Sequence, residues 1–160
     1  MSASKSIANW YLVDRQKLIT AFFNLLDIHP IPSKKILTVK NHLQTFYQTL
    51  IDYVSFGHFA AFNEIFETQK KANSNKAFLE SKFLKSLRTS TNSSLRFNDK
   101  YSKQKYNNIT SREEPEFLEL KKDLSDLMMR LEKRFTLEDI LINQYFKSLH
   151  YKNEPLKPKP

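Results

Sequence analysis

Apolar residues recur along most of the chain at the three- and four-residue spacing of an amphipathic helix. The first such segment spans residues 9–26, and its apolar positions are Trp10, Leu12, Val13, Leu18, Ile19, Phe22, Phe23, Leu25 and Leu26. Residues 1–8 are small and polar, so we expect a frayed start there. The stretch 27-DIHPIP-32 ends the helix because proline disfavours helical geometry in the residue before it. Ser33 can then cap the next helix.

The next segment holds the only glycine of the chain, Gly57, with one apolar stripe on each side of it. The stripe before it consists of Leu43, Phe46, Tyr47, Leu50, Ile51 and Val54, and the stripe after it of Phe59, Phe62, Ile65 and Phe66. On a helical wheel the two stripes point in directions about 100° apart, so a single straight helix would expose one of them. We therefore expect the helix to end at Gly57, because glycine adopts the left-handed conformation of a helix C-terminus at low cost. The alternative is a continuous helix in which the glycine lets a neighbouring helix approach closely.

The second half of the chain is also predicted to be helical. Ser74 can cap a helix whose apolar residues are Phe78, Leu79, Phe83, Leu84 and Leu87. The stretch 89-TSTNSS-94 resembles a loop, and residues 95–108 offer few apolar side chains to a helix. The last helix is the clearest, because acidic residues surround Pro115 at its start and apolar positions continue to Leu149.

No segment shows the period of two that a strand requires. The sequence therefore predicts an all-α, single-domain helical bundle with about five main helices over residues 1–152. A disordered tail is expected at residues 153–160, where proline and lysine alternate.

Composition agrees with one helical domain and excludes several classes of site. A length of 160 residues is enough for one sizeable core, and 13 Phe, 7 Tyr and 1 Trp predict an aromatic-rich interior. The absence of cysteine excludes disulfides and thiolate metal sites. We find no signal-peptide pattern and no apolar run long enough to span a membrane, so we expect a soluble, cytoplasmic protein.

Positive charge is concentrated in the middle of the chain. The formal net charge is +9; residues 71–112 carry ten basic and two acidic side chains, a net +8, whereas residues 113–160 carry nine basic and ten acidic ones. Such a segment is either a solvated flank or a surface for an anionic partner. A nucleic-acid- or polymerase-associated role for residues 71–112 is therefore an alternative function, although the segment lacks the tight helical turn of a sequence-specific DNA reader.

Patterns for catalysis or cofactor binding are absent. The histidines lie at no metal-binding spacing, no GxSxG motif occurs, and a single glycine cannot build a phosphate-cradling loop. Glu138 and Asp139 are adjacent and point to different sides of a helix, which favours solvated carboxylates over an acid–base pair. We expect no enzyme activity, no cofactor and no metal.

Three stretches together resemble a known family. The first helix carries Trp10, Arg15, Gln16, Ile19, Phe22 and Leu25. The second contains 52-DYVSFGHF-59, and the last contains 124-LSDLMMRLEKRFTLED-139. In this order they resemble the Rsd/AlgQ family, the regulator of sigma D proteins, over residues 9–70 and 115–147. Residues 71–112 match it only in being helical.

The resemblance implies an anti-sigma factor with a helical-bundle fold. Such proteins bind the C-terminal, promoter-reading region of the housekeeping sigma factor and keep it from core RNA polymerase and promoter DNA in stationary phase. Core RNA polymerase is a further candidate partner, and a scaffold for phosphocarrier or alarmone-handling proteins is a third hypothesis. Carried over residue by residue, the partner-binding candidates are Arg15, Asp52, Tyr53, Ser55, His58 and Phe59.

These candidates have structural alternatives. Asp52 lies beside an apolar stripe, where it can pair with an arginine of the partner, but it can also pair internally with Arg15. His58 can pack at the helix junction, and Phe59 can belong to the core. Trp10 and Arg134 are expected to hold the bundle together.

Overall fold

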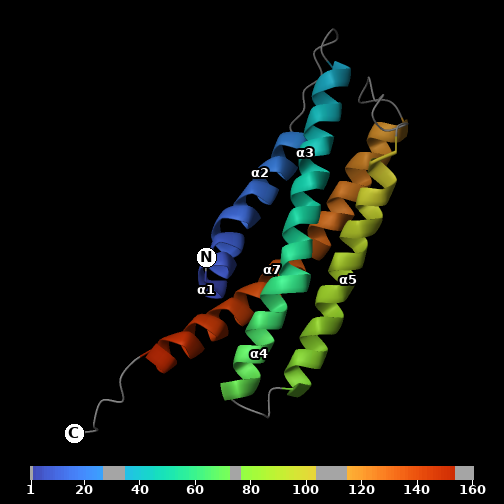
Figure 1. Ribbon diagram of the computed structural model, residues 1–160. Helices are drawn as coiled ribbons and strands as arrows, with labels where there is room; N and C mark the ends of the chain where they lie inside the picture. Colours follow the sequence, from blue (N-terminus) through green and yellow to red (C-terminus); the bar gives the residue numbers. More distant parts are fainter. Residues whose placement is uncertain (1, 27–34, 73–76, 104–114, 154–160) are drawn as a thin grey trace, which may run out of the picture.

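The computed structural model describes residues 2–26, 35–72, 77–103 and 115–153. These form four continuous helical rods (Figure 1). The first comprises α1 (Ala3–Asn9), the π-helical turn η1 (Trp10–Asp14) and α2 (Arg15–Leu26). The second comprises α3 (Lys35–Phe56), the π-helical turn η2 (Gly57–Ala61) and α4 (Phe62–Ala72). The third and fourth are α5 (Ala77–Tyr101) and α7 (Pro115–Asn153). The all-α prediction is confirmed, and the described ranges contain no strand.

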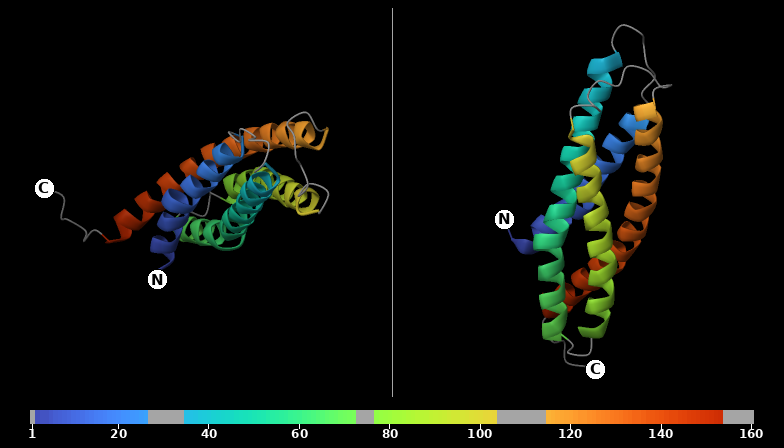
Figure 2. Two further views of the ribbon diagram at one scale, coloured as in Figure 1. Left: turned by 90° about the horizontal axis from the view of Figure 1, so that it is seen from above. Right: turned by 90° about the vertical axis from the view of Figure 1, so that its right-hand side faces the viewer.

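The rods pack into one bundle (Figure 2), and α3 packs against both α2 and α5. The first part of α7 runs beside α5, and α7 then curves away so that its later part packs against α4 (Figure 1). Thr136 lies near the middle of this helix, and its hydroxyl donates to the carbonyl of Glu132 at 3.1 Å. A hydroxyl that bonds back to the preceding turn often bends a helix. No helix of the described segments combines the length and hydropathy that crossing a bilayer requires.

The core is rich in aromatic side chains, as the composition predicts. Trp10 is 1% exposed and stacks on Tyr53 with ring centroids 5.0 Å apart. Phe46 meets Phe97 edge to face at 5.5 Å, which ties α3 to α5. Each such ring contributes about 1.5–3 kcal/mol through burial alone. The largest fully buried side chains are Trp10, Arg134, Tyr53, Tyr101, Tyr145, Phe46, Phe62, Ile7, Leu18, Leu25 and Leu43.

The expected frayed start at residues 1–8 is wrong for residues 2–8, the part that the structure describes. Ser2 caps α1, and its hydroxyl accepts a hydrogen bond from the backbone N–H of Lys5 at 3.3 Å. Ile7 is 2% exposed and belongs to the core. One buried branched side chain in an otherwise polar stretch is sufficient to hold this short helix against the bundle.

The expected break at Gly57 is also wrong, and the alternative of a continuous helix is correct. Gly57 does not have a positive φ, and the rod runs on through η2 into α4. A π turn holds one more residue than an α turn, so it changes the phase of the following helix by about 100°. This equals the offset between the two apolar stripes. Both stripes therefore face one core without a break.

The prediction of a loop at 89-TSTNSS-94 fails because these residues lie inside α5. Their hydroxyls bond to the carbonyls of the preceding turn, as when Ser94 donates to Ser90 at 2.9 Å and Ser93 to Thr89 at 2.9 Å. Ser90, Thr91 and Ser94 are buried. The same helix takes in residues 95–101, the described start of the weakly predicted segment. The expected caps at Ser33 and Ser74 and the tail beyond Asn153 lie outside the described residues.

Candidate functional site

Two close contacts surround Gly57 at the start of η2. A Cβ added to Gly57 would lie 2.8 Å from Cζ2 of Trp10 and 2.9 Å from Nη2 of Arg134. Trp10 begins the other π turn, η1, so the two π turns meet at this point. The indole Nε1 of Trp10 donates to the carbonyl of Tyr53 at 2.9 Å. The only glycine of the chain therefore allows the first and last rods to approach the second.

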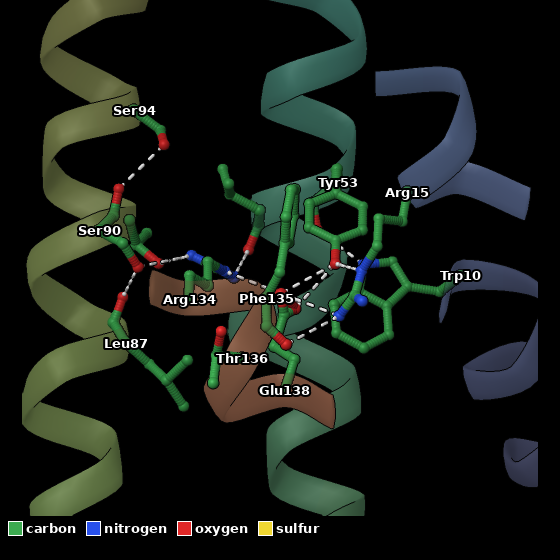
Figure 3. A network of polar contacts seen from close by, with 12 residues as sticks. Trp10, Arg15, Tyr53, Leu87, Ser90, Ser94, Arg134, Phe135, Thr136 and Glu138 are labelled. Atoms are coloured by element: carbon green, nitrogen blue, oxygen red, sulfur yellow. Dashed lines mark hydrogen bonds and ion pairs between the residues drawn. The ribbon is translucent and has the colours of Figure 1, made fainter. Parts of the chain in front are cut away.

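A buried polar network extends from this contact across α3, α5 and α7 (Figure 3). Glu138 lies at its centre and is fully buried. It accepts a hydrogen bond from the hydroxyl of Tyr53 at 2.8 Å. Its Oε1 lies 3.5 Å from Nε of Arg134 and 3.8 Å from Nη2 of Arg15. Burial raises the pKa of Glu138 to about 7, against the lowering effect of both arginines.

Arg15 connects this network to the surface. Its Nη1 lies 2.6 Å from Oδ1 of Asp139, and its Nε donates to the hydroxyl of Tyr53 at 3.2 Å. The guanidinium also lies 4.6 Å from the ring centre of Phe135, a distance that suits a cation–π contact. Burial lowers the pKa of Arg15, but Tyr53, Asp139 and Glu138 outweigh burial and hold that pKa above its ordinary value.

Arg134 extends the network to α5. Its Nη1 donates to the hydroxyls of Thr91 at 2.7 Å and Ser90 at 3.3 Å, and its Nη2 to the carbonyl of Val54 at 3.4 Å. Burial lowers the pKa of Arg134, while Glu138 opposes that effect. The small hydroxyl residues of α5 thus leave room for a buried guanidinium and supply its acceptors.

The network corrects one prediction and confirms another. Glu138 is not a solvated carboxylate but a buried one, whereas its neighbour Asp139 is partly exposed. Trp10 and Arg134 hold the bundle together, as predicted. The sequence analysis missed the role of Glu138. Its spacing of four residues from Arg134 could have indicated it, because residues at this spacing lie on the same face of a helix and can pair.

The sequence-predicted residues around Gly57 separate into a buried and an exposed group. Tyr53 is 1% exposed, and the side chain of Arg15 is 13% exposed. Asp52 and Phe59 are exposed, while Ser55 and His58 are half-buried. Asp52 accepts a hydrogen bond from Gln48 at 3.1 Å and does not pair with Arg15, which binds Glu138 and Asp139. Phe59 is 73% exposed and therefore outside the core.

The exposed group forms a compact surface on the second rod, which we call the Asp52 face: Asp52, Ser55, His58 and Phe59. Asp52, Ser55 and Phe59 are spaced at i, i+3 and i+7, the spacing of one helical face. The rings of His58 and Phe59 meet edge to face at 5.0 Å. Burial lowers the pKa of His58, and the nearby cations Arg134 and Arg88 lower it further. The face thus presents an acid, a neutral imidazole and an exposed phenyl ring.

The described residues contain no group of three or more His, Cys, Asp or Glu side chains that could hold a metal ion. The Asp52 face offers one exposed carboxylate and one exposed aromatic ring. This arrangement suits contact with another macromolecule better than enclosure of a small molecule.

Comparison with known proteins finds relatives for most of the chain. The family model described as regulator of RNA polymerase sigma(70) subunit, Rsd/AlgQ, matches residues 1–146, including the middle segment that the sequence motifs left out. A regulator of sigma D from Enterobacter sp. (strain 638) is 33% identical over 140 residues, which cover 88% of this chain and 79% of the relative. The regulator of sigma D of Yersinia enterocolitica is 29% identical over 142 residues, covering 89% and 81%. No solved structure matches the chain.

Proposed function

The chain belongs to the Rsd/AlgQ family of regulators of the RNA polymerase sigma(70) subunit, and we propose that it acts by binding the C-terminal, promoter-reading region of the housekeeping sigma factor. Membership establishes regulation of sigma(70) and of its use by RNA polymerase. The proposal adds the bound region and the surface that binds it. In this proposal the protein acts by stoichiometric binding rather than by catalysis, in the cytoplasm where transcription takes place.

The observation that carries the proposal is the exposed Asp52 face. Asp52 forms no ion pair with any residue that the structure describes, although the chain has 26 basic side chains. Phe59 exposes most of its ring one to two helical turns away. An exposed aromatic ring beside an unpaired acid is a suitable pair of anchors for a basic partner surface. The sigma C-terminal region is such a partner, because it is a basic DNA-binding module.

Arg15 and Tyr53 have a different part in this proposal. Tyr53 lies beneath the Asp52 face, and Arg15 binds Tyr53, Glu138 and Asp139. We assign them to positioning: they fix the turn of α3 that carries Asp52 against α2 and α7. Ser55 and His58 complete the contact surface beside Phe59.

The other hypotheses receive less support. The nucleic-acid-associated role for residues 71–112 is not favoured, since the whole range to residue 146 matches a family of sigma regulators. Core RNA polymerase remains a second candidate partner for the same protein. Sequestration of sigma(70) needs only the contact with the sigma factor.

The test is an isothermal titration calorimetry experiment at two salt concentrations. The purified protein is titrated with the isolated C-terminal region of its host's housekeeping sigma factor. We expect one-to-one binding that Asp52→Ala weakens at least tenfold, about 1.4 kcal/mol, and that Asp52→Arg weakens further. Phe59→Ala should weaken it as well. Because both side chains are exposed, these variants should keep the stability of the wild type within about 0.5 kcal/mol.

Glu132→Ala is the matched control, because Glu132 is an exposed acid on α7 outside the Asp52 face. It should bind the sigma region as the wild type does. Equal binding by wild type, Asp52→Arg and Phe59→Ala would refute the proposed face. Absence of binding by a folded wild type would refute the proposed sigma region, and the titration would then be repeated with core RNA polymerase.

A further inference from the structure

A long groove lies between α5 and α7, away from the Asp52 face. Its main part has a volume of about 880 Å³ and is lined by Ser86, Thr89 and Ser90 from α5 and by Asp126, Met129, Arg130, Lys133, Arg134, Thr136 and Leu137 from α7. A second part of about 240 Å³ shares Asp126 and Arg130 with the first and continues to Tyr101 and Asp123. We call the two parts together the α5/α7 groove.

None of the other helices that the structure describes covers this groove. In the right-hand view of Figure 2, α5 and the first part of α7 face the viewer side by side with no other helix in front of them. The groove runs from Ser86 to Tyr101 along α5, or about 22 Å at 1.5 Å per residue. The antiparallel stretch from Asp123 to Leu137 on α7 has nearly the same length. A groove of this size matches about four turns of a helix.

The rim of the groove carries unpaired positive charge. Arg96, Arg130 and Lys133 are exposed lining residues, and none of them forms an ion pair with another residue that the structure describes. Lys82 is exposed one turn before Ser86 on the same face of α5. The groove is lined by two acidic residues, Asp123 and Asp126. Asp123 is already paired within the protein, because it binds Lys100 at 2.6 Å and Tyr101 at 2.5 Å. Asp126 is the one acid of the larger part.

The lining of the groove also offers apolar side chains. On α7, Met129 is 61% exposed and Leu137 is half-buried, while the buried lining residues of the main part are Ser90 and Arg134. The wall of α5 contributes short hydroxyl side chains, which keep the groove open where larger residues would fill it. Arg130 is positioned across the groove by the hydrogen bond that its Nη1 donates to Ser93 at 2.8 Å. Unbranched methionine side chains adapt readily to an apolar ligand.

We propose that the α5/α7 groove is a second docking surface, which binds an acidic amphipathic helix of a protein partner. The apolar side chains of that helix would lie on Met129 and Leu137 with the i, i+3, i+4, i+7 spacing of helix-in-groove recognition. Its Asp and Glu side chains would meet Arg96, Arg130 and Lys133 on both rims. The groove shares no lining residue with the Asp52 face, so the two surfaces are distinct and suit partners of opposite charge.

The apolar lining residues favour a protein segment over a nucleic acid. A nucleic-acid backbone is bound by charge and by hydrogen bonds to its phosphates, and it gains nothing from the exposed side chains of Met129 and Leu137. The described lining residues also include no aromatic side chain on the open part of the groove near Met129, on which bases would stack. An amphipathic helix uses both features of the groove, and only its acidic face requires the rim.

The experiment uses three fluorescein-labelled peptides of about 16 residues and measures their anisotropy with the full-length protein. The probe peptide has leucines at the i, i+3, i+4, i+7 positions and glutamates on its flanks. One control peptide has lysine in place of each glutamate, and the other has alanine in place of each leucine. The protein variants are Arg130→Glu/Lys133→Glu and the matched control Lys17→Glu/Lys147→Glu, whose two lysines are exposed outside the groove.

We expect saturable one-to-one binding of the probe peptide that the groove variant weakens at least tenfold and the control variant leaves unchanged. Both control peptides should bind at least tenfold more weakly. Since the chain has no cysteine, Met129→Cys offers a unique site for an environment-sensitive dye. Its emission should shift on peptide binding, whereas the same dye at Lys147→Cys should report nothing.

The proposal fails if the probe peptide does not bind, or if the groove variant binds it as tightly as wild type. It also fails if the alanine peptide binds equally well, because the groove would then act by charge alone. A single-stranded oligodeoxynucleotide that displaces the probe and binds more tightly would make the groove a nucleic-acid surface. The groove variant should still bind the sigma C-terminal region, which keeps this test independent of the Asp52 face.

Discussion

Substitution of Gly57 by alanine tests the central packing contact of the fold. In most helical positions the change from glycine to alanine stabilises a protein, by about 0.8–1 kcal/mol, because alanine has the higher helix propensity. Gly57 lies within a continuous rod and has a helical φ, so this gain is available here. The structure nevertheless predicts the opposite sign, because the new methyl group has no room.

The expected cost follows from the neighbours of the new Cβ. It would lie 2.8 Å from Cζ2 of Trp10 and 2.9 Å from Nη2 of Arg134. Neither neighbour moves easily, since Trp10 is bonded to the carbonyl of Tyr53 at 2.9 Å and Arg134 to Thr91 at 2.7 Å. Overpacking of a rigid core costs about 1–3 kcal/mol. Because both neighbours are held by hydrogen bonds, we expect the upper part of this range, about 2–3 kcal/mol; subtracting the propensity gain of about 1 kcal/mol leaves a net loss of about 1–2 kcal/mol.

Urea unfolding at pH 7, followed by circular dichroism at 222 nm, measures this loss. The midpoint should fall with an unchanged m-value, and the melting temperature by roughly 2–4 °C per kcal/mol. Ala60→Gly is the control, because Ala60 is exposed in the same π turn and reports propensity alone. Combining Gly57→Ala with Trp10→Phe should recover about 1 kcal/mol relative to the sum of the two single changes. A Gly57→Ala variant as stable as wild type, or more stable, would refute the close approach.

Two further variants test the buried network. Because burial raises the pKa of Glu138 to about 7 from the ordinary 4.5, the folded state binds this proton more tightly than the unfolded chain. Its contribution to stability is therefore present below about pH 4.5 and lost as the pH rises to about 7. The free energy of unfolding of wild type minus that of Glu138→Gln should fall by up to about 3 kcal/mol over this window, and a flat or rising difference would contradict the burial argument. Thr91→Val removes the acceptor 2.7 Å from Arg134 and should lower the free energy of unfolding in urea by about 1–2 kcal/mol. Thr89→Val is the control at an exposed site and should cost less than 0.5 kcal/mol. Equal costs for the two variants would show that the Thr91 hydroxyl does not contribute to stability.

The helical architecture could be predicted from the sequence because its apolar spacing is regular over long stretches. Prediction failed where a local preference gave way to a tertiary contact. The run 89-TSTNSS-94 has the composition of a loop, yet it is helical because Ser90 and Thr91 supply the acceptors of Arg134 on a helix far away in the sequence. Glu138 was misjudged for the same reason, since only the fold brings Arg15 and Tyr53 to it.

The candidate site could be predicted in part. The motif around Gly57 located a surface, and the structure separates its members into exposed side chains and buried supports. A helical wheel could not place His58 and Phe59 correctly, because it assumes 100° per residue throughout. The assumption fails within η2, which is also the point where the sequence reasoning placed a break. The contact between Asp52 and a sigma factor stays a prediction until the titration is done.

The π turn explains why Phe59 is available at the surface. In a regular α-helix, residues 59, 62 and 66 share one face through their i, i+3, i+7 spacing, and Phe59 would be buried with the other two. Phe62 is 1% exposed and Phe66 is 4% exposed, whereas Phe59, within η2, is 73% exposed. The extra residue of η2 rotates the following helix onto the core and leaves Phe59 on the side of Asp52 and Ser55. Gly57 permits the rod to continue past Trp10 and Arg134 at this same point. The only glycine and the π turn that begins with it thus place an aromatic ring on the same helical face as the acid, on the surface that we propose for sigma binding.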